Sequence, residues 1–312
     1  MLISIVIPTY NGAQHLPVCL VALRRQTLPP HQVIVVDNAS TDGTQALIAG
    51  HYPEVTLIQL PENRLFTGAC NTGIRASTGQ AVALLNNDTE ADEHWLERIA
   101  ASFARHPEAG LAASKLRLFD KRDHLHSAGD TYSLRGIPGN RGVWQKDEGQ
   151  FDTEFVFGAC GAASVYRRSM LNKIGLLDEA FQFSCEDVDL SWRAALAGYK
   201  CVFAADAIVY HKVSATGGGV LNSYYDGRNF IWLVAKNMPW ALIRENFGAI
   251  VGEQARIAWS ALRAWRGQAA RNRLRGQLMG LLTLPKILAK RRAVQATRTI
   301  GLEAVREMLL AK

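Results

Sequence analysis

Four short apolar runs, separated by segments of helical character, fill the first 85 residues of the chain. Each run consists mainly of Val, Ile, Leu or Ala, and turn-forming residues bound it. The expected strands are residues 4–8, 33–37, 55–58 and 81–85, and the expected helices are 15–26, 43–50 and 67–77. Nearly continuous apolar strands that alternate with helices are typical of a parallel sheet covered on both faces. The sequence therefore predicts an α/β fold with a mostly parallel sheet flanked by helices.

The remainder of the chain divides into an irregular middle and a helical end. Residues 118–157 are rich in Gly, Asp, Arg and His, which favours long loops or a hairpin near the expected functional site. Further on we expect a strand and turn at 155–166, a helix at 187–197, a strand pair at 200–209 that leads to His211, and a flexible Gly-rich loop at 212–221. We therefore divide the chain into an α/β domain, 1–222, and a C-terminal helical extension, 223–312.

Positive charge is concentrated in the helical extension. Residues 237–312 contain 14 basic and 4 acidic residues, whereas the rest of the chain contains 21 basic and 24 acidic residues. A leucine stripe lies at helical spacing among the Arg and Lys residues: Leu274, Leu278, Leu281 and Leu282. This basic amphipathic segment is too short and too charged to span a bilayer, and it favours an anionic membrane surface over nucleic acid as a partner. Packing on the α/β domain or in a homo-oligomer is the alternative.

The cysteines and the N-terminus both favour the cytoplasm. Five cysteines are scattered along the chain and form no Cys-x-x-Cys pair, which argues against a disulfide framework or a zinc site. The N-terminal apolar run reaches Pro8 without a preceding basic segment, which predicts a first strand rather than a signal peptide. We expect a cytoplasmic protein whose basic end favours peripheral association with the inner face of the cytoplasmic membrane.

Polar residues follow three of the expected strands at the point where each strand ends. They are Thr9, Tyr10 and Asn11, then Asp37 and Asn38, and finally Asn86, Asn87 and Asp88. Ligands bind parallel sheets at the carboxyl ends of the strands, so these groups should converge on one ligand. Asp88 could hold Mg²⁺ or Mn²⁺, and Asp37 could accept hydrogen bonds from a nucleobase or a ribose. Asn and Asp also favour turns and helix caps, so a structural explanation stays open for both.

Three further polar groups occur in the second half of the domain and beyond. Glu186, Asp187 and Asp189 stand at the start of an expected helix. The helix dipole favours acidic residues there, but three acidic residues are more than helix capping requires. One of them could accept a proton from a hydroxyl group. His211 ends an apolar run and could bind a metal, and Arg228 could neutralise a phosphate. The alternatives are a structural or surface role for His211 and a solvated charge on a helix face for Arg228.

Taken together, these segments resemble the family 2 glycosyltransferases. The matching segments, in the family's order, are residues 5–11 (IVIPTYN), 35–44 (VVDNASTDGT), Asn63 with Gly68, Asn71 and Gly73, 85–88 (LNND), 186–190 (EDVDL) and His211. Each segment alone is weak, but six in order are highly specific. The resemblance is to bacterial rhamnosyltransferase-like and related cell-surface polysaccharide members. It implies the GT-A fold, with a nucleotide-sugar-binding and catalytic domain at 1–222.

The resemblance also implies a role for each matching residue. Asp187 would be the catalytic base with Glu186 beside it, and Asp88 and His211 would bind a Mg²⁺ or Mn²⁺ cofactor. Thr9, Tyr10 and Asp37 would contact the nucleoside, and Asn71 would line the donor pocket. With the other polar residues singled out above, the expected donor-binding set is Thr9, Tyr10, Asn11, Asp37, Asn38, Asn63, Asn71, Asn87, Asp88 and Arg228. The chain departs from the family in two places. Only one acid remains where the family has its DXD motif, and Arg64 stands where relatives often have a small or apolar residue.

The implied reaction is a single inverting displacement. It would move one sugar from a nucleotide-diphosphate sugar, such as dTDP-rhamnose or a UDP-sugar, to a hydroxyl group of a saccharide or lipid-linked saccharide in cell-surface polysaccharide synthesis. Two other functions stay open at this point. A nucleotidyltransferase also uses a parallel sheet and a metal, although it would usually need a basic Gly-rich loop after the first strand. A non-catalytic module could bind anionic membranes through the basic end.

Overall fold

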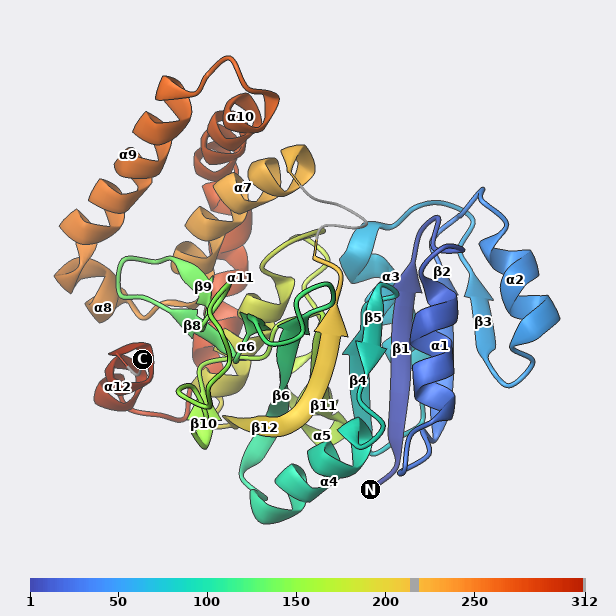
Figure 1. Cartoon of the computed structure of the whole chain (residues 1–312). Helices are drawn as coiled ribbons and strands as arrows, with labels where there is room; N and C mark the ends of the chain where they lie inside the picture. Colours follow the sequence, from blue (N-terminus) through green and yellow to red (C-terminus); the bar gives the residue numbers. More distant parts are fainter. Residues whose placement is uncertain (214–218, 311–312) are drawn as a thin grey trace.

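The first four predicted strands form the parallel half of a ten-stranded sheet (Figure 1). The computed structural model describes residues 1–213 and 219–310. β1 (Ile3–Thr9) lies between β2 (Gln32–Asp37) and β4 (Ala81–Leu85), and β3 (Thr56–Gln59) follows β2 at the edge. All four strands run in parallel, so their carboxyl ends meet at one side of the sheet. The predicted α/β fold with a mostly parallel sheet is confirmed.

Side chains of β1 point alternately into two cores, one on each face of the sheet. Ile5 and Ile7 belong to the first core, and Val6 belongs to the second. The first core is covered by α1 (Leu16–Arg24), α2 (Thr44–His51) and α4 (Trp95–Arg105), and the second by α3 (Leu65–Ala76), α5 (Arg168–Ile174) and α6 (Glu186–Leu196). Burial on both faces explains why the strands are apolar throughout.

One predicted strand pair is instead a single long strand. β12 (Lys200–His211) runs parallel to β6 (Ala109–Leu118), and its register shifts between Ala204 and Ile208. The predicted pair was wrong because the chain continues in one direction through residues 204–208, where a bulge absorbs the register shift. Beyond the bulge, β12 also pairs with β5 (Thr89–Ala91), which sets His211 opposite Thr89. The bulge therefore brings His211 next to the end of β4.

The remaining strands complete a mixed sheet. β11 (Ala163–Arg167) is antiparallel to both β4 and β6, between which it lies. The middle of the chain contains mainly loops, with one hairpin and two short strands on the large sheet, namely β7 (Leu125–Ser127), β8 (Asp130–Tyr132), β9 (Pro138–Asn140) and β10 (Phe155–Val156). Part of the predicted flexible loop, 214–218, lies outside the described residues.

The C-terminal helices form a layer beside the sheet (Figure 1). They are α7 (Val220–Asn237), α8 (Trp240–Glu245), α9 (Phe247–Arg263), α10 (Gln268–Leu282), α11 (Leu284–Ala296) and α12 (Leu302–Leu310). They share a third core with α6, where Trp192 and Trp232 are both buried. Residue 222, the predicted domain boundary, falls in the first turn of α7. Along the described parts of the chain, no helix has both the length and the apolar composition needed to cross a bilayer.

Helices α7 and α10 pack with their backbones in direct contact. A Cβ added to Gly276 would lie 2.0 Å from the carbonyl oxygen of Tyr224, and one added to Gly227 would lie 2.4 Å from that of Arg273. A Cβ added to Gly280, one turn after Gly276, would lie 3.0 Å from the carbonyl oxygen of Arg228. Only glycine fits at the two closest contacts, so this helix pair cannot separate without losing its packing.

The buried carboxylate of Asp189 ties α6 to α7. It accepts hydrogen bonds from Arg193 Nε and Asn237 Nδ2, both at 2.9 Å, and lies 2.7 Å from Lys236 Nζ. Burial alone would raise the pKa of Asp189, but the charges of Lys236 and Arg193 outweigh it and lower that pKa. The same Lys236 ammonium also meets Asp178 at 2.7 Å. These contacts fix the rotation of α6 and therefore the direction of its first turn.

We expect Asp189→Asn to lower the free energy of unfolding by about 3–5 kcal/mol, because it leaves the buried Arg193 without its counter-charge and Lys236 with only one of its two. Urea denaturation of the full chain near neutral pH measures this loss. The matched control is Glu54→Gln, which breaks an exposed ion pair with Arg24 and should barely move the midpoint.

The pH dependence of the same comparison gives a second readout. Because the folded pKa of Asp189 is lowered, its contribution to stability is complete above the unfolded value of about 4. The contribution is lost as the pH falls through the lowered pKa, so the difference between wild type and Asp189→Asn should shrink there. Equal stability of the two proteins at neutral pH would contradict the role given to this carboxylate.

Candidate functional site

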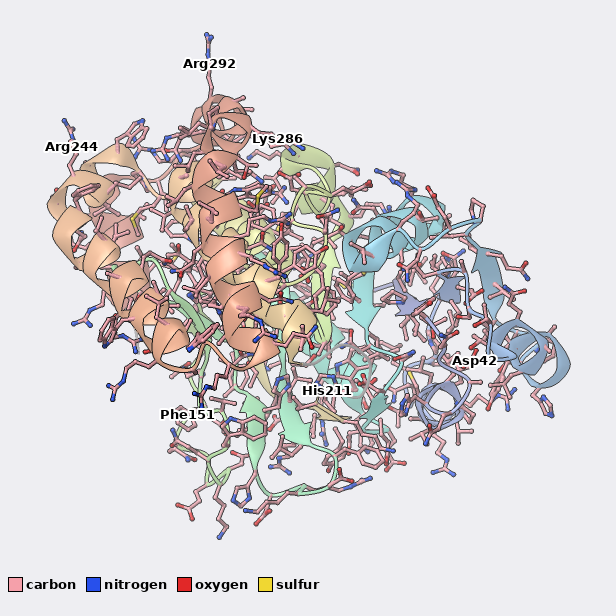
Figure 2. The ribbon with its side chains drawn as sticks, turned by 90° about the horizontal axis from the view of Figure 1, so that it is seen from above. Asp42, Phe151, His211, Arg244, Lys286 and Arg292 are labelled. Carbon is pink, nitrogen blue, oxygen red and sulfur yellow. The ribbon has the colours of Figure 1, made fainter. Side chains whose placement is uncertain are left out.

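A cleft of about 480 Å³ opens where β1, β2 and β4 end. Its volume falls in the range of small-molecule sites. Figure 2 looks down on this end of the molecule and shows His211 near the centre of the view, between the α/β half and the C-terminal helices. The predicted residues that line the cleft are Thr9, Tyr10, Asn38, Asn63, Asn87, Asp88, Glu186, Asp187 and His211. Groups more than 200 positions apart in the sequence thus meet in one cavity.

The ends of β1 and β4 are joined by a side-chain hydrogen bond. Asn87 Nδ2 donates to Thr9 Oγ1 at 2.7 Å, and both side chains are buried. A Cβ on Gly12 would lie 2.0 Å from Thr9 Oγ1, so only glycine allows the chain to turn away here. Tyr10 keeps 47% of its surface exposed at the rim, where its ring is free to stack against a flat ligand.

The wall beyond β2 is built from asparagine side chains. Asn38 Nδ2 donates to Asn63 Oδ1 at 2.9 Å, and Asn38 Oδ1 accepts the backbone N–H of Arg64 at 2.8 Å. These bonds hold the segment before α3 against the end of β2. The Arg64 side chain turns away from the cleft and donates to Glu179 Oε2 at 2.9 Å, so it does not narrow the cavity.

Asp88 and His211 face each other with their polar atoms close together. His211 Nε2 lies 3.2 Å from Asp88 Oδ1 and 3.3 Å from Asn86 Nδ2. Both Asp88 and His211 are buried, yet Asp88 Oδ1 makes no hydrogen bond with any residue in 1–213 or 219–310. A buried carboxylate oxygen without a donor is costly, unless a cation compensates it. An imidazole nitrogen and a carboxylate oxygen at this separation fit two metal bonds of about 2.1 Å.

The protein alone supplies only part of a metal's coordination shell at this place. Within residues 1–213 and 219–310, no group of three or more His, Cys, Asp or Glu side chains is arranged to hold an ion. Mg²⁺ and Mn²⁺ prefer oxygen ligands, and Mg²⁺ in particular is often bound by one or two carboxylates together with water and substrate phosphates. A two-ligand site is therefore suited to an ion that arrives with a phosphate-bearing ligand.

His126, on β7, also lines the cleft and was missed by the sequence analysis. Its Nδ1 lies 3.1 Å from Nδ1 of His211, and the two rings are 4.8 Å apart. Burial, with a smaller contribution from His211, lowers the pKa of His126 to about 3, so this imidazole is neutral at physiological pH. A neutral ring can accept the proton of His211 Nδ1, which leaves Nε2 of His211 with its lone pair toward Asp88.

The chain enters α6 through a strained turn that delivers two carboxylates to the cleft. Gln182, Ser184 and Cys185 all have φ near +65°, a left-handed conformation that is uncommon for residues other than glycine. Glu186 and Asp187 follow directly and line the cavity. Such backbone strain is typical of functional sites.

Asp187 is held more firmly than Glu186. Its Oδ2 accepts the backbone N–H of Gly161 at 2.7 Å, and its Oδ1 accepts that of Val188 at 2.7 Å. Burial raises the pKa of Asp187, although these hydrogen bonds oppose the rise. Burial and, next, the neighbouring Asp187 raise the pKa of Glu186 well above its usual range. In the part of the chain that the structure describes, Glu186 Oε2 has no hydrogen-bond partner. Both groups therefore bind a proton more readily than ordinary carboxylates.

Asp37 and Asn11 stand behind the cleft rather than in it. Asp37 is fully buried and accepts a hydrogen bond from Gln45 Nε2 at 2.7 Å. Asn11 Oδ1 accepts the backbone N–H of Thr41 at 2.8 Å. Both side chains shape the loop after β2, and neither lines the cavity.

Asn71 and Arg228 also lie outside the cavity lining. Asn71 Nδ2 donates to the carbonyl oxygen of Leu177 at 2.9 Å. The Arg228 guanidinium is buried and donates to Gln182 Oε1 at 3.1 Å and to the carbonyl oxygens of residues 180 and 181. Arg228 thus holds the strained turn that precedes α6, and its donors are already occupied.

Comparison with known proteins places the chain in a family. The model of glycosyl transferase family 2 matches residues 4–175, which is more than half of the chain. The chain is 27% identical over 264 residues to N-acetylglucosaminyl-diphospho-decaprenol L-rhamnosyltransferase of Mycobacterium tuberculosis, a match that covers 76% of this chain and 86% of that protein. It is 28% identical over 226 residues to O-antigen biosynthesis protein RfbC of Myxococcus xanthus, but this match spans only 17% of that much longer protein.

Solved structures agree in fold. The crystal structure of S. aureus TarS 1-349 in complex with UDP-GlcNAc superposes with a TM-score of 0.61 at 17% sequence identity, and the match covers 99% of this chain and 91% of that one. At this level of identity the likeness concerns the fold alone. The chain therefore belongs to glycosyl transferase family 2 and has the GT-A fold.

Proposed function

We propose that this protein is a metal-dependent, inverting glycosyltransferase that moves one sugar from a nucleotide-diphosphate sugar to a hydroxyl group of a saccharide or lipid-linked saccharide. The observation that carries the proposal is the set of side chains that line one cleft. Asp88 Oδ1, which finds no hydrogen-bond partner among the described residues, faces His211 Nε2, and the fixed carboxylate of Asp187 lines the same cavity. This arrangement joins a cation site to a proton acceptor.

The charge of the cleft supports a metal-bound donor. Three carboxylates, Asp88, Glu186 and Asp187, line it, and the described lining contains no Lys or Arg. A nucleoside diphosphate would meet only like charge there, because the donors of Arg228 are engaged elsewhere. Mg²⁺ or Mn²⁺ held by Asp88 and His211 would supply the missing positive charge and stabilise the departing diphosphate. Asn86 and His126 would orient the His211 ring.

The remaining lining residues suit the nucleoside and the sugar. Tyr10 would stack on the base, and the polar groups of Thr9, Asn38 and Asn63 surround the same end of the cleft. Asp37 and Asn11 would contribute by holding the loop after β2 in place. TarS is solved with UDP-GlcNAc, and the M. tuberculosis relative is named for an L-rhamnosyl group. We therefore propose a dTDP-rhamnose-like or UDP-sugar donor.

The proton acceptor of the reaction would be Asp187. The acceptor hydroxyl would give its proton to this carboxylate while its oxygen forms a bond to the anomeric carbon and the bond from that carbon to the diphosphate breaks. Two backbone N–H groups fix Asp187, and its remaining lone pairs are free for the hydroxyl. The raised pKa of Asp187 makes it a better base than an ordinary Asp. Glu186 lies beside it, and its own raised pKa would allow it either to remain a negative neighbour or to bind a proton itself.

The acceptor would belong to cell-surface polysaccharide synthesis. The name of the M. tuberculosis relative specifies a lipid-linked N-acetylglucosaminyl diphosphate, and that of the M. xanthus relative specifies O-antigen biosynthesis. A lipid-linked acceptor would place the enzyme at the inner face of the cytoplasmic membrane. Nucleic acid has no part in this proposal.

We expect Asp187→Asn to lower kcat by about 10²–10⁴ while donor binding stays nearly intact, because the substitution removes the base but keeps the side-chain shape. Single-turnover transfer and calorimetric titration with the donor nucleotide measure the two quantities. The control is Glu62→Gln, an exposed acid on the loop after β3 that should leave both unchanged. Since burial raises the pKa of Asp187, the wild-type rate should fall on acidification at a higher pH than a free Asp would cause. Wild-type turnover by Asp187→Asn would remove this residue from the mechanism.

We expect Asp88→Asn and His211→Ala each to weaken Mn²⁺ binding in the presence of the nucleotide by tenfold or more, because each removes one of two protein ligands. Electron paramagnetic resonance of free Mn²⁺ reads the affinity directly, and inhibition of transfer by EDTA gives an independent check. His31→Ala, an exposed histidine far from the cleft, is the control. Unchanged Mn²⁺ titrations in both variants, or full transfer in excess EDTA, would rule the metal site out.

A further inference from the structure

Helix α9 and the turn after it carry large apolar side chains that are exposed in the described part of the chain. Phe247, Val251 and Trp259 lie at multiples of four residues along α9 and therefore share one face. Trp259 is 62% exposed and Trp265, in the turn that follows α9, is 60% exposed. Leu262 between them is half exposed. A contiguous group of this kind marks an interaction surface rather than scattered exposure.

Helix α10 continues this surface. It runs antiparallel to α9, since Gln277 Nε2 donates to the carbonyl oxygen of Gln254 in the middle of α9 at 3.0 Å. Leu278, Leu281 and Leu282, three of the four leucines of the predicted stripe, are more than half exposed. These three leucines therefore do not pack on the α/β domain. We call the exposed faces of α9, α10 and their connecting turn the hairpin surface.

The charge on the hairpin surface has one sign. Arg263, Arg266 and Arg275 are exposed and take part in none of the ion pairs found within residues 1–213 and 219–310. The single acid of the hairpin, Glu253, is already paired with Arg256. In Figure 2, Arg244 and Arg292 also point outward from the helical region. Exposed arginine therefore accompanies exposed tryptophan on the hairpin surface.

We propose that the hairpin surface docks the enzyme on an anionic lipid bilayer, with Trp259, Leu262 and Trp265 entering the interface and Arg263 and Arg266 binding lipid headgroups. Tryptophan favours the membrane–water interface because its ring is apolar and its N–H is polar, and arginine near an anionic leaflet is attracted to it. A second copy of this chain fits less well, because a symmetric contact would bring like charges together.

The direction of the cleft agrees with this docking. The turn between α9 and α10 and the carboxyl ends of β1 and β2 lie at the same end of the molecule (Figure 1). Asn272 Nδ2 of α10 donates to the carbonyl oxygen of Val220, and the next residues of α7, Leu221 and Asn222, line the cleft. A bilayer under the hairpin turn would therefore lie near the mouth of the cleft. This step rests on the proposed lipid-linked acceptor, whereas lipid binding itself does not.

The test is flotation of the full chain with vesicles of phosphatidylcholine alone and of phosphatidylcholine with phosphatidylglycerol, at low and at high salt. We expect binding to the anionic vesicles at low salt, with a strong reduction at high salt. The double variants Trp259→Ala with Trp265→Ala, and Arg263→Glu with Arg266→Glu, should each lower the partition coefficient by about tenfold or more. Circular dichroism checks that each variant is folded.

Matched controls keep the result specific to the hairpin surface. Trp144→Ala removes an equally exposed tryptophan from another part of the chain, and Arg25→Glu with Arg105→Glu reverses two exposed charges on the α/β domain. Both controls should bind vesicles like wild type. No binding to anionic vesicles at low salt, or equal losses in control and hairpin variants, would overturn the proposal. A dimer in light scattering that only the hairpin variants dissociate, without vesicle binding, would also overturn it and assign the surface to a second copy.

The same variants separate this inference from the proposed reaction. Hairpin variants should keep Mn²⁺ and nucleotide binding and transfer to a water-soluble acceptor, because their side chains lie outside the cleft. If flotation fails while transfer persists, only the docking surface is wrong. If flotation succeeds while no transfer is found, the proposed reaction is wrong and lipid binding stands.

Discussion

The buried carboxylate of Asp189 is the interaction on which the rest of the molecule depends. It compensates Lys236 and Arg193 in a place where none of the three would be stable alone. Since Asp189 lies within one turn of Glu186 and Asp187, the same contacts that join α6 to α7 decide where those two carboxylates point. Arg228, also on α7, holds the turn that precedes α6. The C-terminal helices are thus part of the structure that forms the site.

The electrostatics of the cleft follow from an excess of acidic over basic side chains. Carboxylates approach each other there without Lys or Arg among the described lining residues, and burial raises the pKa of Glu186 and Asp187. An anionic ligand would make this imbalance worse unless it brought a cation with it. The single carboxylate at Asp88, paired with an imidazole, would make ion and ligand bind together rather than separately, because neither finds a complete site alone.

The sequence predicted the structure best where the local residue pattern and the topology of the sheet lead to the same result. Apolar runs bounded by turns predicted β1 to β4, and the rule that ligands bind at strand ends placed Thr9, Asn87 and Asp88 in one cavity. His211 was found because it ends an apolar run, although the run proved to be one bulged strand and not two.

Other features depend on contacts that no local pattern encodes. His126 reaches the cleft only because β7 pairs with β6, and the single signal for it was a histidine in a segment expected to lie near the site. Arg228 was expected to neutralise a phosphate because of its charge. In the structure its guanidinium donates to Gln182 Oε1 and to carbonyl oxygens 47 and 48 positions away in the sequence. The exposure of α9 could not be derived either, because an amphipathic helix looks the same whether its apolar face is covered or free.

The close contact between Gly276 and the backbone of α7 holds the hairpin in one position relative to the cleft. An arm joined this rigidly does not act as a flexible tether. With the hairpin surface on a bilayer, it would hold the cleft at a constant distance from the lipid. Acceptors whose terminal sugar sits closer to or farther from the membrane than that distance would be out of reach, so chain length itself would become a criterion of substrate choice.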